Sequence, residues 1–271
     1  MRRPRLAGLA TIPGRPLERA LRSLRPQVDE LCVYLNGFTE VPSIVKTLDC
    51  HAILDPENRG AERKLAWTRT WTGLYYSMDD DIDYLPGYAD FLEETVDRWR
   101  GMALVSLHGR RFTGAWPGWT SPVGQARYYE ATLGGWCNHL GTGVLAFDTG
   151  HLRPPHDWPK TNSIDALLSV WAQRQHLPMW IPAHDGSLAK PIQGCGEDSI
   201  YETARKQGYA NRNRIYETVP FWQTWSMHGV HRTLQPLPRH QCRKMATWPP
   251  GTRLVRRPDG TTLSVDDPDV V

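Results

Sequence analysis

The chain has 271 residues, 40% of them hydrophobic and 23% charged, and a net charge of +3. This composition supports a buried core over one large or two small domains, and it excludes a disordered chain or a collagen-like repeat. The longest apolar runs, such as 103–107, fall far short of the ~20 residues of a membrane helix, and no apolar stretch follows the basic start. The five cysteines are scattered and form no CxxC pair. The sequence therefore predicts a cytoplasmic protein with no membrane association, disulfide framework or zinc ribbon.

Short, almost continuous apolar runs alternate with helical patterns through the first two thirds of the chain. Such runs are typical of buried strands, and the segment 87–100 carries apolar residues at helical spacing before Gly101. The alternation predicts an α/β fold with a mainly parallel sheet flanked by helices. The expected strands are 6–12, 31–36, 52–54, 74–78, 103–107 and 144–147, and the expected helices are 17–24, 87–100 and 163–175.

The pattern changes after Pro182. The segment 185–196 is predicted to be a mobile loop, 199–208 one more helix and 252–265 a small hairpin, with the remainder irregular. We therefore expect a domain over 1–184 and a C-terminal extension over 185–271 that packs on it. Residues 203–257 hold eleven Lys and Arg and one acid. This charge favours a polyanionic partner, either a diphosphate or a nucleic acid, although a solvated surface with cancelling charges explains it equally well.

Three carboxylates, Asp79, Asp80 and Asp81, follow the apolar run 74–78. Their mutual repulsion at the end of a buried strand is costly unless a positive group binds there. In open α/β sheets ligands bind beyond the carboxyl ends of strands, and hard divalent cations bridge carboxylates to substrate phosphates. The cluster thus predicts Mg²⁺ or Mn²⁺ carrying a diphosphate. The alternative is an Asp-rich turn that caps the helix 87–100.

The order of several segments resembles the GT-A glycosyltransferases, particularly the family-2-like group. The similarity extends over residues 5–182 and implies a Rossmann-like GT-A fold and a nucleotide-sugar donor, a UDP-sugar above all. No GxSxG elbow, GxxxxGK[ST] loop or GxGxxG motif supports a hydrolase, kinase or dehydrogenase instead. The segments that carry the resemblance are 10–15 with 21–24, 27–31 with 34–37, 58–61 with Lys64, 79–81, 140–147 and 162–165.

The resemblance implies roles for individual residues on the donor side. Asp79-x-Asp81 resembles the DxD motif, in which Asp81 ligates the metal and Asp79 contacts the ribose or the metal through water. Asp83 is a further candidate. Asn36 stands where many relatives carry an acid that holds the base or ribose. The implied donor-binding residues are Thr11, Pro13 and Arg15 at the nucleotide, Arg59 and Lys64 near the pyrophosphate or sugar, and Asp79 and Asp80.

The resemblance also implies an inverting displacement in which Asp165 is the catalytic base. The alternative role for Asp165 is stabilisation of the helix dipole in a first turn, and Asp157 is the reserve base. Many GT-A enzymes add a late histidine as a third metal ligand. His184, His228 and His231 are the candidates, of which we select His228.

Tryptophans interleave with the basic stretch 203–257, a combination that suits contact with nucleic acid. Together with the lack of a membrane helix, this favours an acceptor in solution. The leading expectation is a phage-type enzyme that modifies 5-hydroxymethylcytosine in viral DNA, flipping the base if it lies in a duplex. Alternatives are a polysaccharide or protein acceptor and, from another class, a non-catalytic nucleic-acid-binding protein. Nothing in the sequence sets the oligomeric state.

Overall fold

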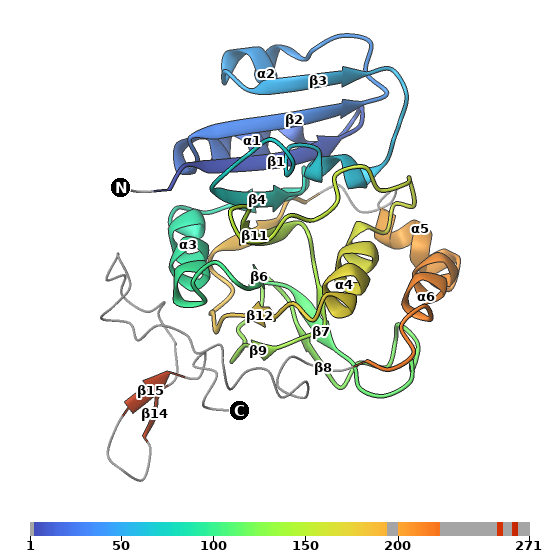
Figure 1. Cartoon of the computed structure of the whole chain (residues 1–271). Helices are drawn as coiled ribbons and strands as arrows, with labels where there is room; N and C mark the ends of the chain where they lie inside the picture. The colour runs from blue at the N-terminus through green and yellow to red at the C-terminus, as the bar shows by residue number, and fades with distance from the viewer. Residues whose placement is uncertain (1–2, 194–199, 223–253, 257–261, 265–271) are drawn as a thin grey trace.

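The computed structural model describes residues 3–193, 200–222, 254–256 and 262–264, and its centre is an eight-stranded sheet (Figure 1). The strand order is β3-β2-β1-β4-β11-β6-β12-β9. The strand bounds are β1 Arg5–Thr11, β2 Glu30–Asn36, β3 His51–Asp55, β4 Leu74–Met78, β6 Leu104–Ser106, β9 Gly135–Trp136, β11 Val144–Asp148 and β12 Met179–Ile181. All six strands expected from the apolar runs are therefore present.

The sheet is mixed, whereas the sequence predicted a mainly parallel one. The half formed by β3, β2, β1 and β4 is parallel, and β12 is parallel to β6. Strand β11 runs antiparallel to both β4 and β6, and β9 runs antiparallel to β12. An apolar run that is buried on both faces has the same pattern in either direction, so the prediction had no basis for the direction of β11.

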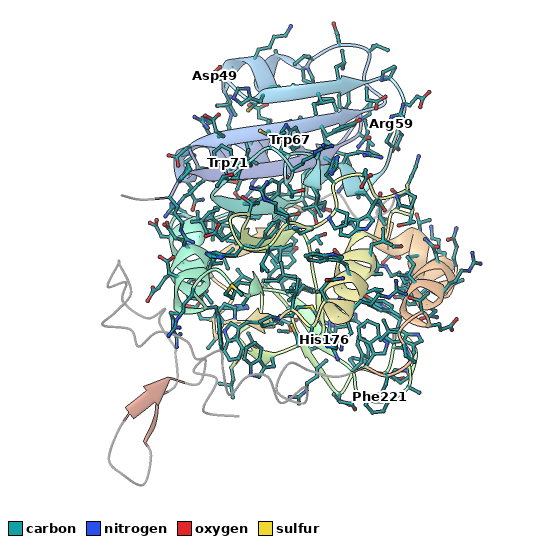
Figure 2. The ribbon with its side chains drawn as sticks, in the orientation of Figure 1. Asp49, Arg59, Trp67, Trp71, His176 and Phe221 are labelled. Carbon is teal, nitrogen blue, oxygen red and sulfur yellow. The ribbon has the colours of Figure 1, made fainter. Side chains whose placement is uncertain are left out.

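Helices cover both faces of the sheet. On one face, α1 (Leu17–Leu24) and α3 (Tyr88–Arg98) bury their apolar sides against alternate residues of the strands, such as Ala7 and Leu9 of β1. On the other face, the short helix η2 (Ala61–Leu65) and α4 (Ile164–Arg174) pack against the remaining strand positions, with Trp67 and Trp71 beside them (Figure 2). The other helices are η1 Arg25–Gln27, α2 Ser43–Thr47, α5 Ile200–Lys206 and α6 Ala210–Tyr216.

A third, smaller core lies between α4 and α6. It contains Phe112, Trp119, Tyr216 and Trp222. The prediction treated the region of α6 as irregular, because the chain after residue 208 is rich in Pro, Trp and Arg. The expected helix 199–208 corresponds to α5.

Small sheets complete the described part. β10 (His139–Leu140), β7 (Gly109–Arg111) and β8 (Gly124–Ala126) form one, and β13 (Ala189–Pro191) pairs with β5 (Ile82–Tyr84). The segment 185–196, expected to be a mobile loop, thus contains a strand. The hairpin predicted over 252–265 has its two strands, β14 (Leu254–Arg256) and β15 (Thr262–Ser264), while its turn lies outside the described residues. Among the helices described, none combines the length and the apolar character needed to cross a bilayer.

The parallel half of the sheet brings three polar residues to one edge. Thr11 ends β1, Asn36 ends β2 and Asp79 follows β4, and all three strands point the same way. The carboxyl edge of such a sheet is where α/β proteins bind ligands.

Candidate functional site

A cavity of about 1090 Å³ lies at this carboxyl edge. Its walls come from β1, η2, the residues after β4, the turn before β11, the start of α4 and the helices α5 and α6, so residues on both sides of the predicted boundary at 184 contribute. The cavity gathers most of the residues selected from the sequence: Thr11, Arg15, Asn36, Lys64, Asp79, Asp80, Asp81 and Asp165.

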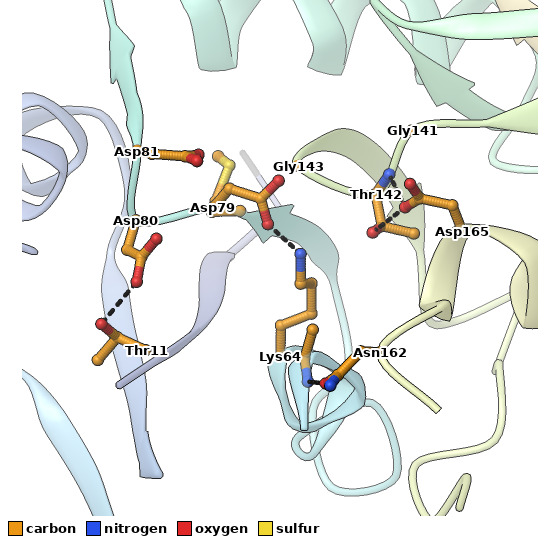
Figure 3. A network of polar contacts seen from close by, with 12 residues as sticks. Thr11, Lys64, Asp79, Asp80, Asp81, Gly141, Thr142, Gly143, Asn162 and Asp165 are labelled. Carbon is orange, nitrogen blue, oxygen red and sulfur yellow. Dashed lines mark hydrogen bonds and ion pairs between the residues drawn. The ribbon is translucent and has the colours of Figure 1, made fainter. Parts of the chain in front are cut away.

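Asp80 links the acidic segment 79–81 to the end of β1 and the loop that follows it. Its side chain is buried, and Thr11 Oγ1 donates to its Oδ2 at 2.6 Å (Figure 3). Arg15 Nε donates to its Oδ1 at 3.0 Å. Both oxygens therefore have partners within the protein. Asp80 acts as a support that places Thr11 and Arg15 on the cavity wall.

Asp81 lies in a cluster in which negative charges outnumber positive ones. Arg15 Nη2 donates to its Oδ2 at 2.7 Å. Even so, burial, and after it the charges of Asp79 and Asp80, raise the pKa of Asp81 to about 6 in spite of Arg15. Three carboxylates on this wall face two cations, Arg15 and Lys64, so the wall favours a further positive group.

Asp79 lies at the centre of the site, where it forms an ion pair with the buried amine of Lys64 (Figure 3). The backbone of Lys64 is held in turn by Tyr75, whose hydroxyl donates to the Lys64 carbonyl at 2.6 Å. The backbone N–H of Asp79 donates to Tyr84 Oη at 2.8 Å. The backbone of Asp79 is therefore held in place, and its side chain, which is 38% exposed, lies at the cavity.

The fit of this wall to a divalent cation rests on Asp79 and Asp81. Within the described part of the chain, no group of three or more His, Cys, Asp or Glu is arranged to hold a metal ion. Mg²⁺ and Mn²⁺ nevertheless commonly bind through one or two carboxylates, with substrate phosphates and waters as the other ligands. Burial, and after it the charges of Asp79 and Asp80, raise the pKa of Asp81, and a bound cation would relieve the repulsion among these carboxylates. The residues present therefore fit such an ion held jointly with a diphosphate.

Asp165 enters the cavity from the first turn of α4. Thr142 donates to its Oδ1 twice, from the backbone N at 2.8 Å and from the hydroxyl at 2.5 Å (Figure 3). Burial acts to raise the pKa of Asp165, but His139, Arg212, Lys64 and the hydrogen bond from Thr142 outweigh it and lower the pKa to about 2. The carboxylate is therefore ionised at neutral pH, and neither hydrogen bond from Thr142 uses its Oδ2.

The segment leading into α4 is positioned by the buried Glu62 of η2. Glu62 Oε1 accepts hydrogen bonds from Thr161 N at 3.0 Å, Thr161 Oγ1 at 2.7 Å and Ser163 N at 3.2 Å. Through these bonds, the helix that supplies Lys64 also holds the segment that supplies Asp165. Sequence reasoning missed this role, because a buried glutamate cannot be told from a surface one by its spacing.

Asn36 supports a loop. Its Nδ2 donates to the Gly60 carbonyl at 3.2 Å, and its Oδ1 accepts from Arg59 N at 2.9 Å. The side chain of Arg59 is half exposed near the end of β3, pairs with Asp55 and Glu57, and is absent from the cavity lining (Figure 2).

Other residues selected from the sequence lie away from the cavity. Pro13 and Asp157 are exposed and do not line it. Asp83 forms an ion pair with Arg19 in a separate groove. His184 is buried, with Leu107 O 3.1 Å from its Nε2 and Gly186 N donating to its Nδ1 at 3.2 Å, so both ring nitrogens are engaged. His228 and His231 lie outside the described residues.

The cavity is also lined by residues that sequence reasoning did not select. Burial lowers the pKa of His108 to about 4 and the pKa of His139 well below its usual value. Arg110 and Arg212 also line the cavity, and the guanidinium of each makes a cation–π contact with the Trp119 ring. For Arg212 the only sequence signal was the basic character of 203–257, and no sequence signal indicated His108, Arg110 or His139.

Comparisons with known proteins give little further information. No protein-family model and no curated protein matches the chain. Among solved structures, the chain is similar to the crystal structure of A197 from STIV, with a TM-score of 0.36 and 12% sequence identity over 68% of this chain and 82% of that one. A likeness at this level carries no argument about function.

Proposed function

We propose that the chain is a metal-dependent glycosyltransferase of the GT-A type, which moves a sugar from a nucleotide-sugar donor to an acceptor hydroxyl. One observation carries this proposal: Asp165 lines the same cavity as Asp79 and Asp81 although it comes from a distant part of the sequence. The resemblance in the order of sequence segments gives independent support.

The donor is proposed to bind at the β1 and β4 side. Asp79 and Asp81 would hold Mg²⁺ or Mn²⁺, and such an ion neutralises the diphosphate that leaves. Arg15 and Lys64 add two fixed cations on the same wall. Thr11 and Asn36, at the ends of β1 and β2, stand where the nucleoside would enter. The volume of about 1090 Å³ suits a nucleotide-sugar with room for the reacting part of an acceptor.

Asp165 is proposed to accept the proton of the acceptor hydroxyl. The oxygen of this hydroxyl attacks the anomeric carbon of the donor sugar. As the new bond forms, the bond from that carbon to the diphosphate oxygen breaks, and the nucleoside diphosphate leaves with the electron pair. Thr142 orients the carboxylate during the transfer by its two hydrogen bonds to Oδ1. Attack opposite to the leaving group inverts the anomeric configuration.

The acceptor proposed is 5-hydroxymethylcytosine in viral DNA, which offers a primary hydroxyl on a base that can be flipped into a cavity. The basic stretch 203–257 supports this choice of acceptor. The alternatives are a polysaccharide acceptor, a protein acceptor, and a chain that binds nucleic acid without catalysis. A panel of acceptors distinguishes them, because each alternative gives a different result.

Donor binding is tested by thermal melting with a panel of sugar nucleotides and Mn²⁺. We expect one donor to raise the Tm only when Mn²⁺ is present, and Asp81→Asn to abolish the rise. Asp83→Asn is the matched control, because Asp83 is two residues away yet lies outside the cavity. Absence of any shift with the whole panel would contradict the proposal.

A further inference from the structure

Arg212 is a buried cation without a partner among the described residues. It lies on α6, is 7% exposed and lines the cavity. Within the described residues its guanidinium forms no hydrogen bond and no ion pair, and its Nε is a buried donor without an acceptor. Leaving a buried charge unpaired is costly, and five N–H donors on this group call for an acceptor.

The surroundings hold this guanidinium in place and do not neutralise it. Its central carbon lies 4.9 Å from the centre of the Trp119 ring, and that of Arg110 lies 4.0 Å from the same ring. Arg110 Nη1 also donates to the Trp119 carbonyl at 2.8 Å. Cation–π contacts orient a guanidinium without supplying an anion. The carboxylate that acts on Arg212 electrostatically is Asp165, which is not within ion-pair distance.

We propose that Arg212, supported by Arg110, binds a phosphate group of the acceptor beside its reacting hydroxyl. This inference rests on the proposed function and adds the chemical class of the acceptor, a nucleotide within a phosphodiester strand. Guanidinium groups present a planar fork of donors that matches phosphate oxygens, which is why arginine is the preferred residue for such contacts. Arg212 on α6 and Asp165 at the start of α4 come from two helices that pack against each other, so we place the phosphate on the Asp165 side of the cavity.

Occupation of this site also acts on the catalytic base. Arg212 is one of the charges that lower the pKa of Asp165. A phosphate bound to Arg212 would offset that charge, so the pKa of Asp165 would rise and its carboxylate would become a stronger base. An acceptor without a phosphate would leave the base weak.

The site is first tested by binding, independently of transfer. In metal-free buffer, inorganic phosphate is expected to raise the Tm of the wild type and of Arg214→Gln but not that of Arg212→Gln. Arg214 is the matched control because it is an exposed arginine on the same helix. Arg212→Lys keeps the charge and is expected to retain part of the shift. If phosphate raised the Tm of Arg212→Gln as much as that of the wild type, the proposed phosphate site would be wrong, whether or not the protein transfers sugar.

Transfer then identifies the source of the phosphate. We expect Arg212→Gln to raise KM about 10–100-fold for an oligonucleotide containing 5-hydroxymethylcytosine. The KM of the phosphate-free nucleoside and the affinity for UDP with Mn²⁺ are expected to stay unchanged. A loss of UDP affinity would assign Arg212 to the donor and overturn the inference, as would an equal loss for both acceptors. Absence of transfer by the wild type would count against the proposed function alone.

Discussion

The carboxylate of Asp79 lies directly against the backbone of Gly143. A Cβ atom built on Gly143 would lie 2.0 Å from Asp79 Oδ2, so any larger residue at this position requires the Asp79 side chain to move. The register explains the contact, because Val144 of β11 faces Met78 of β4 in an antiparallel pair and the preceding glycine therefore faces Asp79. The antiparallel direction of β11 is thus part of how the site is built.

Gly143→Ala is expected to displace the Asp79 carboxylate and to reduce transfer by at least about tenfold, since an ångström of misplacement is enough for such a loss. Kinetics and Mn²⁺-dependent melting measure the effect. Gly124→Ala is the control, because a Cβ there meets its nearest neighbour at 3.8 Å. If Gly143→Ala keeps full activity, the placement of Asp79 is irrelevant to function.

Lys64→Met removes the cation that pairs with Asp79. We expect the metal-free variant to lose about 1–3 kcal/mol of unfolding free energy, because a partly buried carboxylate is left without its partner. Mn²⁺ should restore more of the Tm in the variant than it adds to the wild type, since the ion then neutralises Asp79 alone. Thermal melts in EDTA and in Mn²⁺ measure this, with the exposed Lys160→Met as control. If Mn²⁺ raised the Tm of Lys64→Met and of the wild type equally, this would argue against a cation at Asp79.

Asp165→Asn is expected to show a pH-dependent loss of stability. The folded-state pKa of Asp165 is about 2, below its ordinary value of 3.8. Its carboxylate therefore stabilises the fold above pH 4, and this contribution disappears as the pH falls towards 2. We expect the variant to lose about 1–2 kcal/mol at pH 7 and progressively less below pH 4, measured by urea unfolding. Asp157→Asn, at an exposed position, should show no such trend. A deficit that stays constant with pH would refute the lowered pKa.

Glu62→Ala tests the support of α4. Removal of Oε1 leaves the Thr161 N–H without its acceptor and leaves the Ser163 N–H with Thr161 Oγ1, at 3.1 Å, as its remaining acceptor. We expect a loss of about 2–4 kcal/mol in unfolding free energy and a fall in kcat, because the start of α4 that carries Asp165 is released. Glu62→Gln keeps an acceptor oxygen and should recover most of both. Glu57→Ala, an exposed acid ahead of the same helix, is the control. Full activity in Glu62→Ala would show that Asp165 needs no such support.

The sequence was informative where a local pattern determines structure. The strand over 74–78 and the acids after it were predicted together, because a continuous apolar run indicates a buried strand and a cluster of charges marks the point where it leaves the core. The helix 163–175 was visible from its apolar stripe, and its observed bounds, Ile164–Arg174, differ by one residue at each end. These two elements supply Asp79, Asp81 and Asp165, so the central residues were within reach of sequence reasoning.

The remaining features depend on contacts between distant segments. No local pattern gives the direction of β11, and thus the contact between Gly143 and Asp79. The fixed amide of Asn36, the engaged imidazole of His184 and the guanidinium of Arg212, unpaired within the described part of the chain, are consequences of packing. Each belongs to a residue type that is equally common on surfaces, so only the folded chain reveals its environment.

Mass spectrometry of acceptors incubated with sugar nucleotides and Mn²⁺ tests the central claim most directly. We predict that an oligonucleotide containing 5-hydroxymethylcytosine gains the mass of one sugar as one nucleoside diphosphate is released. Asp81→Asn and Asp165→Asn should abolish the gain, and Asp83→Asn should preserve it. A gain that persists in Asp81→Asn and Asp165→Asn, or no gain on any nucleic acid, polysaccharide or protein acceptor with any donor, would contradict the account.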